Sequence, residues 1–316
     1  MRRSRFAGRA VVAVILAAVA ASAIAAAAWT ALSRNAESGR EEAAQNRDSN
    51  TFYEIFVRAF HDSDGDGIGD LNGIAEKLDY VQEMGFSGIW LTPVHPSPSY
   101  HGYDVTDYYA IHPDFGTMED FERLVKEAHA RNIRVIMDLV ANHTSSRHPW
   151  FLEAARDPDS PKRDWYVWAD ENTNTAAASA IGGRAWHPKG GGHYLGIFWD
   201  GMPDLNPDNP DVLAEMINIA RFWLDKGVDG VRLDAAKHLY ENFPHEAGKK
   251  AVSDKNTAWW RAFREGASAV KPDVYLVGEV WDTATVIGPY LDGAFDAAVN
   301  FDLAGRMIAM AKSGEA

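Results

Sequence analysis

The segment Gly230-Val-Arg-Leu-Asp-Ala-Ala-Lys-His238 decides the fold class. It opens as a short apolar run, carries the cation Arg232 inside that run and ends it with the carboxylate of Asp234. An apolar run that ends in a polar residue is typical of a buried parallel strand whose carboxyl end faces a pocket. Side chains alternate across a strand, so Arg232 and Asp234 point to the same face.

Two other segments have the same form. Asp138 and Glu279 also end short apolar runs, and helix-periodic segments separate the three runs. Any one of them alone would be interpreted as a turn residue after a strand. In a (β/α)8 barrel, however, the carboxyl ends of all strands face one pocket, so the three carboxylates would converge there. No Gly-x-Gly-x-x-Gly turn follows the first strand, which favours this α/β barrel (TIM barrel) over a dinucleotide-binding sheet.

The strands and helices expected along the chain alternate, as a parallel sheet requires. The helices expected are one over 71–81 that stops at Gly85, one with a Thr117/Asp120 capping box, and one from Asn209-Pro210 to Gly227. The strands expected are Tyr53–Val57, Gly88–Leu91, Val135–Leu139, Gly230–Asp234, Tyr275–Glu279 and Ala294–Asn300.

Composition excludes several classes of function. The chain has 316 residues, no Cys, and a formal charge of -14 from 31 Lys plus Arg against 45 Asp plus Glu. The lack of Cys excludes disulfides, thiolate metal sites and a Cys nucleophile. Nucleic acid is not expected as a partner, because phosphate binding needs clustered cations.

The N-terminus predicts export. Four Arg precede an apolar run over about 11–32, so residues 1–33 are interpreted as an export signal and 34–50 as a polar tether. The run is also long enough to span a bilayer, and the competing interpretation is an uncleaved signal anchor over residues 10–32. Both interpretations predict a secreted or extracytoplasmic protein, with membrane contact only through such an anchor.

A long segment separates the third and fourth expected strands. Residues 143–206 are interpreted as an inserted subdomain, called subdomain B, between the barrel parts 51–142 and 207–316. The insert carries Trp150, Trp165, Trp168, Trp186 and Trp199. Flat rings suit the apolar faces of sugars, but we expect most of these Trp to form a small core of the insert itself.

These residues also carry a family resemblance. The segments 138–143 (DLVANH), 230–238 (GVRLDAAKH) and 278–281 (GEVW) resemble three ordered signature regions of the α-amylase family, glycoside hydrolase family 13. The segment 202–206 (MPDLN) is similar to the fifth region, in the form of the subfamily between oligo-1,6-glucosidases and neopullulanases. Segments 85–93 and 101–104 also match family positions. The resemblance runs from about residue 51 to 316 and implies a TIM barrel.

The resemblance implies a retaining glycosidase with Asp234 as nucleophile and Glu279 as acid/base, which would work through a covalent glycosyl-aspartate intermediate. A fixed cation at Arg232 would keep the aspartate ionised. A less exposed glutamate with a raised pKa would hold its proton until the leaving oxygen needs it.

The resemblance also implies a substrate site. Tyr103 would stack on the sugar at the cleavage point, His143 would donate to its hydroxyls, and Asp104 would support the same subsite. Lys237 and His238 match residues on the leaving-group side, and Arg232 completes the set. Ala235 after the nucleophile is similar to α-1,4-acting members, whereas 1,6-acting glucosidases typically have Val.

We therefore expect α-1,4 cleavage of starch-type glucans or maltooligosaccharides. An exo-acting α-glucosidase or a neopullulanase-like enzyme is the alternative. A rival of another class is a non-catalytic glucan-binding protein, such as an amylase-like ancillary subunit of a transporter, and the presence of both Asp234 and Glu279 argues against it.

The segment 62–70 (DSDGDGIGD) predicts a Ca²⁺ site. Its carboxylates stand at alternate positions, as hard oxygen ligation favours, but Gly73 replaces the Glu that an EF-hand needs at its twelfth position. The segment resembles the family's calcium loop after the first strand. That resemblance implies the ligands Asp62, Asp64, Asp66, Asp70 and the backbone carbonyl of Ile68, in a structural role.

The sequence departs from the family pattern at its C-terminal end. It contains no Phe-x-x-x-His-Asp segment of the fourth signature region, which carries the third catalytic carboxylate. The length after residue 53, less the insert, suits about six of the eight βα units. We therefore expect a barrel truncated after about the sixth strand, as the N-terminal part of a longer enzyme. Such a truncated chain would by itself have little activity.

Overall fold

The parallel sheet holds six strands in the computed structural model, which describes residues 51–314. Its order is β1-β2-β3-β6-β7-β8, so each strand pairs in parallel with the next barrel strand along the chain. The bounds are Phe52–Ile55 (β1), Gly88–Leu91 (β2), Arg134–Leu139 (β3), Gly230–Leu233 (β6), Tyr275–Gly278 (β7) and Ala297–Ala298 (β8).

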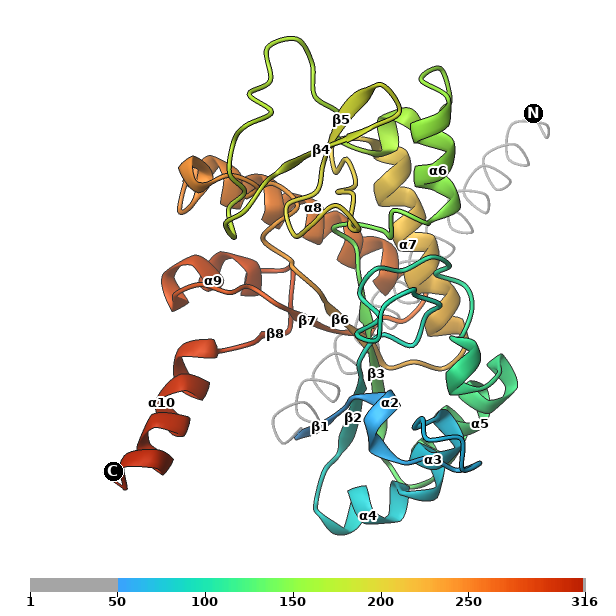
Figure 1. The fold of residues 1–316 in the computed structure, drawn as a ribbon. Helices are drawn as coiled ribbons and strands as arrows, with labels where there is room; N and C mark the ends of the chain where they lie inside the picture. Colours follow the sequence, from blue (N-terminus) through green and yellow to red (C-terminus); the bar gives the residue numbers. More distant parts are fainter. Residues whose placement is uncertain (1–50, 315–316) are drawn as a thin grey trace, which may run out of the picture. The chain divides into compact units, whose positions relative to one another are not determined.

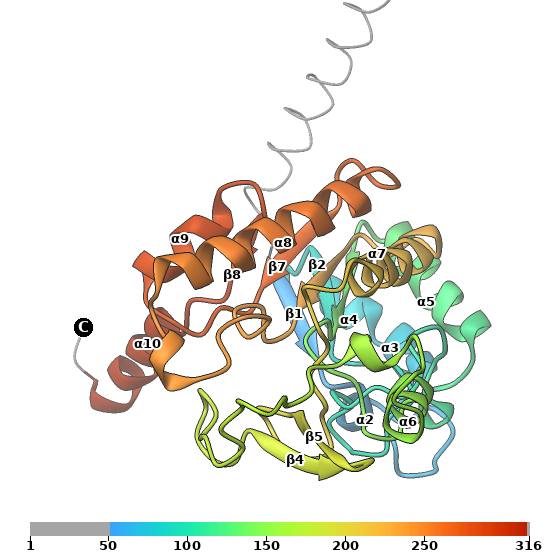
Figure 2. The same cartoon turned by 90° about the horizontal axis from the view of Figure 1, so that it is seen from above.

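This strand order distinguishes a barrel from a doubly wound sheet. A doubly wound sheet reverses direction at a switch point, whereas a barrel adds its strands in one direction. The six strands follow one direction and curl into a half-barrel (Figure 2). The predicted fold class, a TIM barrel truncated after about six strands, is confirmed.

Helices that pack outside the strands supply many of the buried apolar residues. Leu71, Leu124, Met216 and Phe263 are fully buried examples from four different helices. The α-helices are α2 (Val57–Phe60), α3 (Leu71–Glu76), α4 (Leu78–Glu83), α5 (Met118–Ala130), α6 (Pro149–Arg156), α7 (Pro210–Asp225), α8 (Lys250–Ser268), α9 (Ala284–Leu291) and α10 (Phe301–Ser313).

The predicted caps are present. Thr117 and Asp120 form a reciprocal capping box at the start of α5, and the Asn209 side chain accepts the N–H of Asp211 at the start of α7. These local hydrogen bonds satisfy donors that the first helical turn leaves free. The helix predicted over 71–81 is instead two short helices, because the backbone at Lys77 leaves helical geometry (φ -105°, ψ 7°).

Four predicted strands were too long. The strands β6 and β7 end one residue before the predicted ends at Asp234 and Glu279, and two other strands differ by more. The chain leaves the sheet after Ile55, and Val57 begins α2, which places the loop 62–70 beside this helix. The last strand is reduced from Ala294–Asn300 to Ala297–Ala298. Ala294 and Phe295 are buried, and the Phe295 N–H bonds Tyr290 O at the end of α9. Ala294 and Phe295, which the prediction counted as part of the strand, therefore belong to the turn that follows α9.

The insert between β3 and β6 contains α6 and an antiparallel pair, β4 (Trp186–Lys189) and β5 (Gly192–Leu195). Figure 1 shows this pair beyond one end of the parallel sheet. The prediction that most insert Trp form a core of its own was wrong. Trp186 does so, but Trp150, Trp165 and Trp168 belong to a cluster that is continuous with the main core. Trp199 is 47% exposed.

The predicted export segment 1–33 and tether 34–50 lie outside the described residues, so these assignments stay predictions. Within residues 51–314, the structure has no helix with both the length and the apolar character needed to cross a membrane. The helix α10 extends away from the sheet (Figure 1) and exposes Leu303, Met307, Ile308 and Met310.

Candidate active site

The guanidinium of Arg232 joins three carboxylates at the carboxyl ends of neighbouring strands. Its Nη1 lies 3.0 Å from Asp138 Oδ1 and 2.7 Å from Asp234 Oδ1. Its Nη2 lies 2.9 Å from Glu279 Oε2. The strand register produces this arrangement, since Asp138 pairs with Arg232 across β3 and β6. The three carboxylates therefore lie close together at the carboxyl ends of the strands, as the sequence predicted.

The two carboxylates assigned by resemblance to catalysis have different surroundings. Burial and the nearby charge of Asp234 raise the pKa of Glu279, against the lowering effect of Arg232. The expectation of a less exposed glutamate was wrong: the side chain of Glu279 is 19% exposed and that of Asp234 is 12% exposed. Burial is still the largest cause of the raised pKa of Glu279, and the neighbouring aspartate adds to it.

The backbone at Ala235 holds Glu279 in place. Ala235 has a φ of 49°, in the left-handed region that residues with a Cβ rarely adopt. In this conformation its N–H donates to Glu279 Oε2 at 3.0 Å. Strained backbone of this kind is concentrated at functional sites, where the surrounding structure enforces it.

Asp138 and Tyr103 lie beside Arg232 and contact each other. The Tyr103 hydroxyl donates to Asp138 Oδ2 at 2.9 Å, and the Arg232 guanidinium lies 5.8 Å from the centre of the Tyr103 ring. Burial raises the pKa of Asp138 to about 7, although Arg232 acts in the opposite direction. The hydrogen bond from its hydroxyl to Asp138 holds the ring of Tyr103 in position.

His143 offers a donor to the site. The Asn142 amide donates to its Nδ1 at 3.3 Å, which places the ring proton on Nε2. That Nε2 is buried and has no hydrogen-bond partner among the described residues. Burial lowers the pKa of His143 to about 4, so the ring is neutral at physiological pH. An orphaned buried donor that lines a cavity is suited to a polar ligand.

Asp104 lies beneath the site and not in its wall. It is buried, and it accepts hydrogen bonds from the hydroxyls of Ser97, at 2.7 Å, and Ser99. Among the sequence-predicted substrate residues within the described chain, it alone does not line the cavity. It therefore supports the loop that carries Tyr103.

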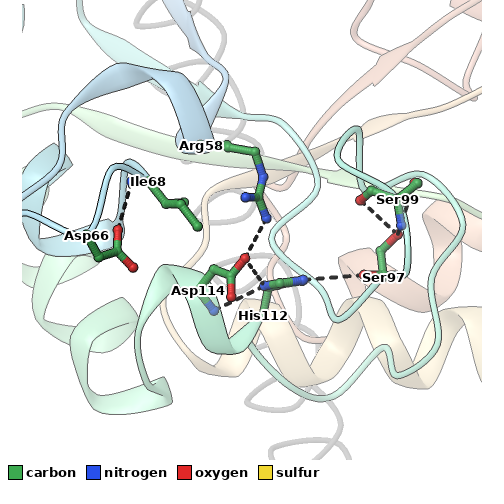
Figure 3. A network of polar contacts seen from close by, with 7 residues as sticks. All are labelled: Arg58, Asp66, Ile68, Ser97, Ser99, His112 and Asp114. Carbon is green, nitrogen blue, oxygen red and sulfur yellow. Dashed lines mark hydrogen bonds and ion pairs between the residues drawn. The ribbon is translucent and has the colours of Figure 1, made fainter.

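A polar network holds this loop against α2 (Figure 3). Arg58 Nη2 donates to Asp114 Oδ2 at 2.7 Å, and the Asp114 N–H donates to His112 Nδ1 at 3.1 Å. The other ring nitrogen of His112 lies 3.3 Å from the carbonyl oxygen of Ser97. Since Nδ1 accepts, the proton is on Nε2, which donates to that carbonyl.

Lys237 and His238 lie on the other side of Arg232 and belong to one polar group. The Lys237 ammonium lies 3.0 Å from Glu241 Oε1 and 3.1 Å from Asp282 Oδ2. Burial alone would lower the pKa of Lys237, but these two carboxylates raise it. Burial lowers the pKa of His238, whose Nδ1 lies 2.6 Å from the carbonyl oxygen of Glu241.

Several of the residues described above line a cavity of about 710 Å³, called the first cavity. This size is typical of small-molecule sites. Of the sequence-predicted residues it contains Tyr103, His143, Arg232, Asp234, Lys237, His238 and Glu279. Sequence analysis assigned no role to several other lining residues: His101, Phe198, Trp199, Glu241, Trp281 and Asp282. The position of Glu241, four residues after Lys237, was the available signal for an ion pair.

The loop 62–70 assembles part of the predicted metal site. Carboxylate oxygens of Asp62, Asp64 and Asp70 lie within 4.8 Å of one another. The Asp66 carboxylate lies outside this group and accepts the Ile68 N–H at 2.7 Å (Figure 3). Asp70 also caps α3 by accepting the Gly73 N–H. Three carboxylates are an oxygen donor set that fits Ca²⁺.

A family model supports the assignment that this geometry suggests. The model described as "Alpha amylase, catalytic domain" matches residues 54–315. The chain belongs to the alpha-amylase family. The match begins within β1 and covers the other strands, the insert and all residues of the first cavity.

Known members of the alpha-amylase family agree with this assignment. Alpha-amylase 3 of Dictyoglomus thermophilum is 51% identical over 257 residues, which are 81% of this chain and 48% of that protein. The oligo-1,6-glucosidase of Parageobacillus thermoglucosidasius is 46% identical over 213 residues, covering 64% of this chain and 38% of its own length. The chain therefore spans about half the length, or less, of these relatives.

Two solved structures have the same fold over the part that they share with this chain. The alpha-amylase of H. orenii superposes with a TM-score of 0.76 at 55% identity, covering 84% of this chain and 54% of that one. The trehalose-6-phosphate hydrolase of Bacillus licheniformis does so with a TM-score of 0.72 at 36% identity, covering 80% and 48%. The half-barrel is thus the form that this part of an alpha-amylase family chain takes.

Replacement of Arg232 tests how far the site depends on its charge. We expect Arg232→Met to lower the free energy of unfolding by at least ~3 kcal/mol, because it leaves neighbouring buried carboxylates without a cation. The matched control is Arg261→Met, whose ion pair with Asp292 is largely exposed and should cost under ~1 kcal/mol. Urea unfolding of both variants measures the difference. Equal losses in the two variants would contradict the assignment.

Proposed function

We propose that the protein is a retaining glycoside hydrolase that cleaves α-1,4-glucosidic bonds of starch-type glucans or maltooligosaccharides. The observation that carries the proposal is the contact of one guanidinium with both Asp234 and Glu279 inside the first cavity. A retaining glycosidase needs two close carboxyl groups, one as nucleophile and one as acid/base. A pure binding site has no need of such a pair.

The proposed reaction has two steps. Asp234 attacks the anomeric carbon and forms a glycosyl ester, while Glu279 gives its proton to the leaving glycosidic oxygen. The ionised Glu279 then takes a proton from water, whose oxygen attacks the same carbon and releases Asp234. The pKa of Glu279 is raised by burial and by Asp234, which favours the protonated form that the first step needs.

The walls of the cavity suit sugar units on both sides of the bond. Tyr103 and Trp199 offer aromatic rings, and His143 Nε2 is an available donor for a hydroxyl. Lys237 and His238 line the same cavity, and the family resemblance implies that they contact the leaving-group side of the substrate. Ala235 supports α-1,4 over α-1,6 specificity through its similarity to α-1,4-acting members.

The nucleophile is tested by Asp234→Asn, with the exposed Asp273→Asn as the matched control. We expect Asp234→Asn to lower the rate of maltooligosaccharide hydrolysis by at least ~10³-fold while binding persists, because the amide is no nucleophile. Product release by the protein at its natural length, and calorimetric binding, measure the two effects. Binding without turnover in the unaltered protein would instead support a non-catalytic glucan-binding protein.

The acid/base is tested by the pH dependence of hydrolysis. Glu279 must hold a proton in the first step, so the rate should fall as pH rises through its pKa, which lies above the ordinary 4.5. Glu279→Gln should slow hydrolysis of maltooligosaccharides by ~10²- to 10⁴-fold and remove that falling limb. It should slow the first step with α-maltosyl fluoride far less, because fluoride leaves without a proton. An unchanged falling limb in Glu279→Gln would rule out this role.

We further propose that the loop 62–70 binds Ca²⁺ through Asp62, Asp64 and Asp70. Asp66 and the carbonyl of Ile68 are further candidate ligands, as the family resemblance implies. The ion would supply positive charge to a crowded acidic loop that adjoins α2, and its effect would be on stability. The Gly69 N–H donates to Arg58 O at 2.7 Å, so the loop is attached to this helix.

Calorimetry of chelator-treated protein tests this site. We expect one Ca²⁺ per chain to bind, and saturation at 100 times Kd to stabilise the fold by about 2.7 kcal/mol, seen as a higher Tm. Asp62→Ala should abolish both effects, whereas Asp159→Ala, in an exposed loop, should change neither. The proposal fails if the treated protein takes up no Ca²⁺ and its Tm does not respond to the ion.

A further inference from the structure

The first cavity carries more negative than positive charge. Among the described residues that line it, the cations are Arg232 and Lys237, and the acids are Asp234, Glu241, Glu279 and Asp282. Protonation of Glu279, which the proposed reaction needs, still leaves three carboxylates against two cations. Charges that face a cavity with low-dielectric walls act strongly on a ligand. The field in this cavity therefore opposes an anion.

The charge of Arg232 is already balanced inside the protein. Its guanidinium contacts Asp138, Asp234 and Glu279 at 2.7 to 3.0 Å. A guanidinium that binds carboxylates through both terminal nitrogens attracts a further anion only weakly. Within residues 51–314, Lys237 is then the remaining cation of the wall to which an anionic ligand could bind.

Two carboxylates surround the ammonium of Lys237. Its Nζ lies 3.0 Å from Glu241 Oε1 and 3.1 Å from Asp282 Oδ2, and both acids line the same cavity. The side chains of Lys237, Glu241 and Asp282 are 12%, 8% and 23% exposed, so water and salt screen their charges little. Because two carboxylates face one ammonium, this group is anionic as a whole, although its central residue is a cation.

Hydrogen bonds hold both carboxylates in place. Asp282 Oδ1 accepts the N–H of Thr283 at 2.7 Å. The Glu241 N–H donates to Lys237 O at 3.2 Å, and that carbonyl oxygen also accepts the Asn256 amide at 2.8 Å. Lys237 could pair with an incoming anion only by breaking existing ion pairs. An ammonium has three donors, however, so one remains for a neutral hydroxyl.

The imidazoles of the wall add no positive charge. The Tyr103 N–H donates to His101 Nδ1 at 3.1 Å, and the Asn142 amide donates to His143 Nδ1 at 3.3 Å. A doubly protonated imidazole has no acceptor, so both rings are neutral in this geometry. Burial lowers the pKa of His238, which favours its neutral form as well. The three imidazoles can therefore bind hydroxyls without attracting an anion.

We propose that Glu241 and Asp282 are specificity-determining residues, which neutralise Lys237 and so make the first cavity accept neutral sugar units and reject anionic ones. The excluded class is sugars that carry a phosphate or a carboxylate on the unit next to Lys237. This inference rests on the proposed function, because it takes the first cavity to hold the substrate. Lys237 then acts on the substrate as a hydrogen-bond donor, and its charge is spent on the two acids.

Binding calorimetry of the protein at its natural length, in an Asp234→Asn background, tests this charge selection. The probes are maltotriitol and maltotrionate, whose open-chain ends differ only at C1, an alcohol in the first and a carboxylate in the second. We expect the parent to bind maltotriitol at least about tenfold more tightly than maltotrionate. Raising the salt concentration from about 0.01 M to about 0.5 M should narrow this ratio, because salt screens the repulsion.

The variant Asp282→Asn removes one negative charge and keeps the shape of the side chain. We expect it to shift the ratio of the two dissociation constants about tenfold in favour of maltotrionate. Glu241→Gln should shift the ratio in the same direction, and it repeats the test if the first variant does not fold. The matched control is Asp254→Asn on α8, an exposed acid that also pairs with a Lys and lies outside the first cavity. It changes the net charge equally and should leave the ratio unchanged.

Three results would overturn the inference. They are equal affinities of the parent for the two probes, no binding of either probe, and a ratio that Asp282→Asn and Glu241→Gln shift no more than Asp254→Asn does. Hydrolysis of maltotriose by the unaltered protein is measured separately. Failure of that hydrolysis, with the selection against maltotrionate retained, would overturn the proposed function and leave the charge selection standing.

Discussion

The site depends on the ion pairs that the guanidinium of Arg232 forms with three carboxylates. The guanidinium is almost fully buried and contacts carboxylates from three neighbouring strands or their ends. A buried cation is costly unless it is paired, and buried carboxylates are costly unless a cation neutralises them. Each therefore makes the other possible, and together they fix the relative positions of β3, β6 and β7 at their carboxyl ends.

Two groups of polar contacts hold the residues around this charged centre in place. On the side of Tyr103, Asp104 and the Arg58–Asp114–His112 network secure the loop that follows β2. On the side of Lys237, two carboxylates hold the ammonium in one position. Neither group needs a ligand to form, so the geometry of the first cavity is set before any substrate arrives. Preorganisation of this kind is what makes fixed charges effective in catalysis.

Local sequence signals predicted local structure well and failed where packing decided. The strand Gly88–Leu91 and the caps of α5 and α7 agree with the structure, because short-range hydrogen bonds and alternation specify them. The prediction of a single helix over 71–81 was wrong, because the backbone leaves helical geometry at Lys77. The four apolar residues that predicted it are nevertheless all buried. Three Trp of the insert belong to a cluster that is continuous with the main core, which no periodicity could indicate.

The sequence by itself determined the strand order, the family and the residues at the ends of β3, β6 and β7, since each depends on residue types at short spacing or on ordered motifs. Only the tertiary structure decided that Arg232 also contacts Glu279, that Asp104 lies below the cavity wall, and that Asp66 stands apart from Asp62, Asp64 and Asp70. It alone placed Phe243 beside Trp186. The physical reason is that such contacts join residues far apart in the chain, whose distances are fixed by how helices and loops pack and not by any pattern along the sequence.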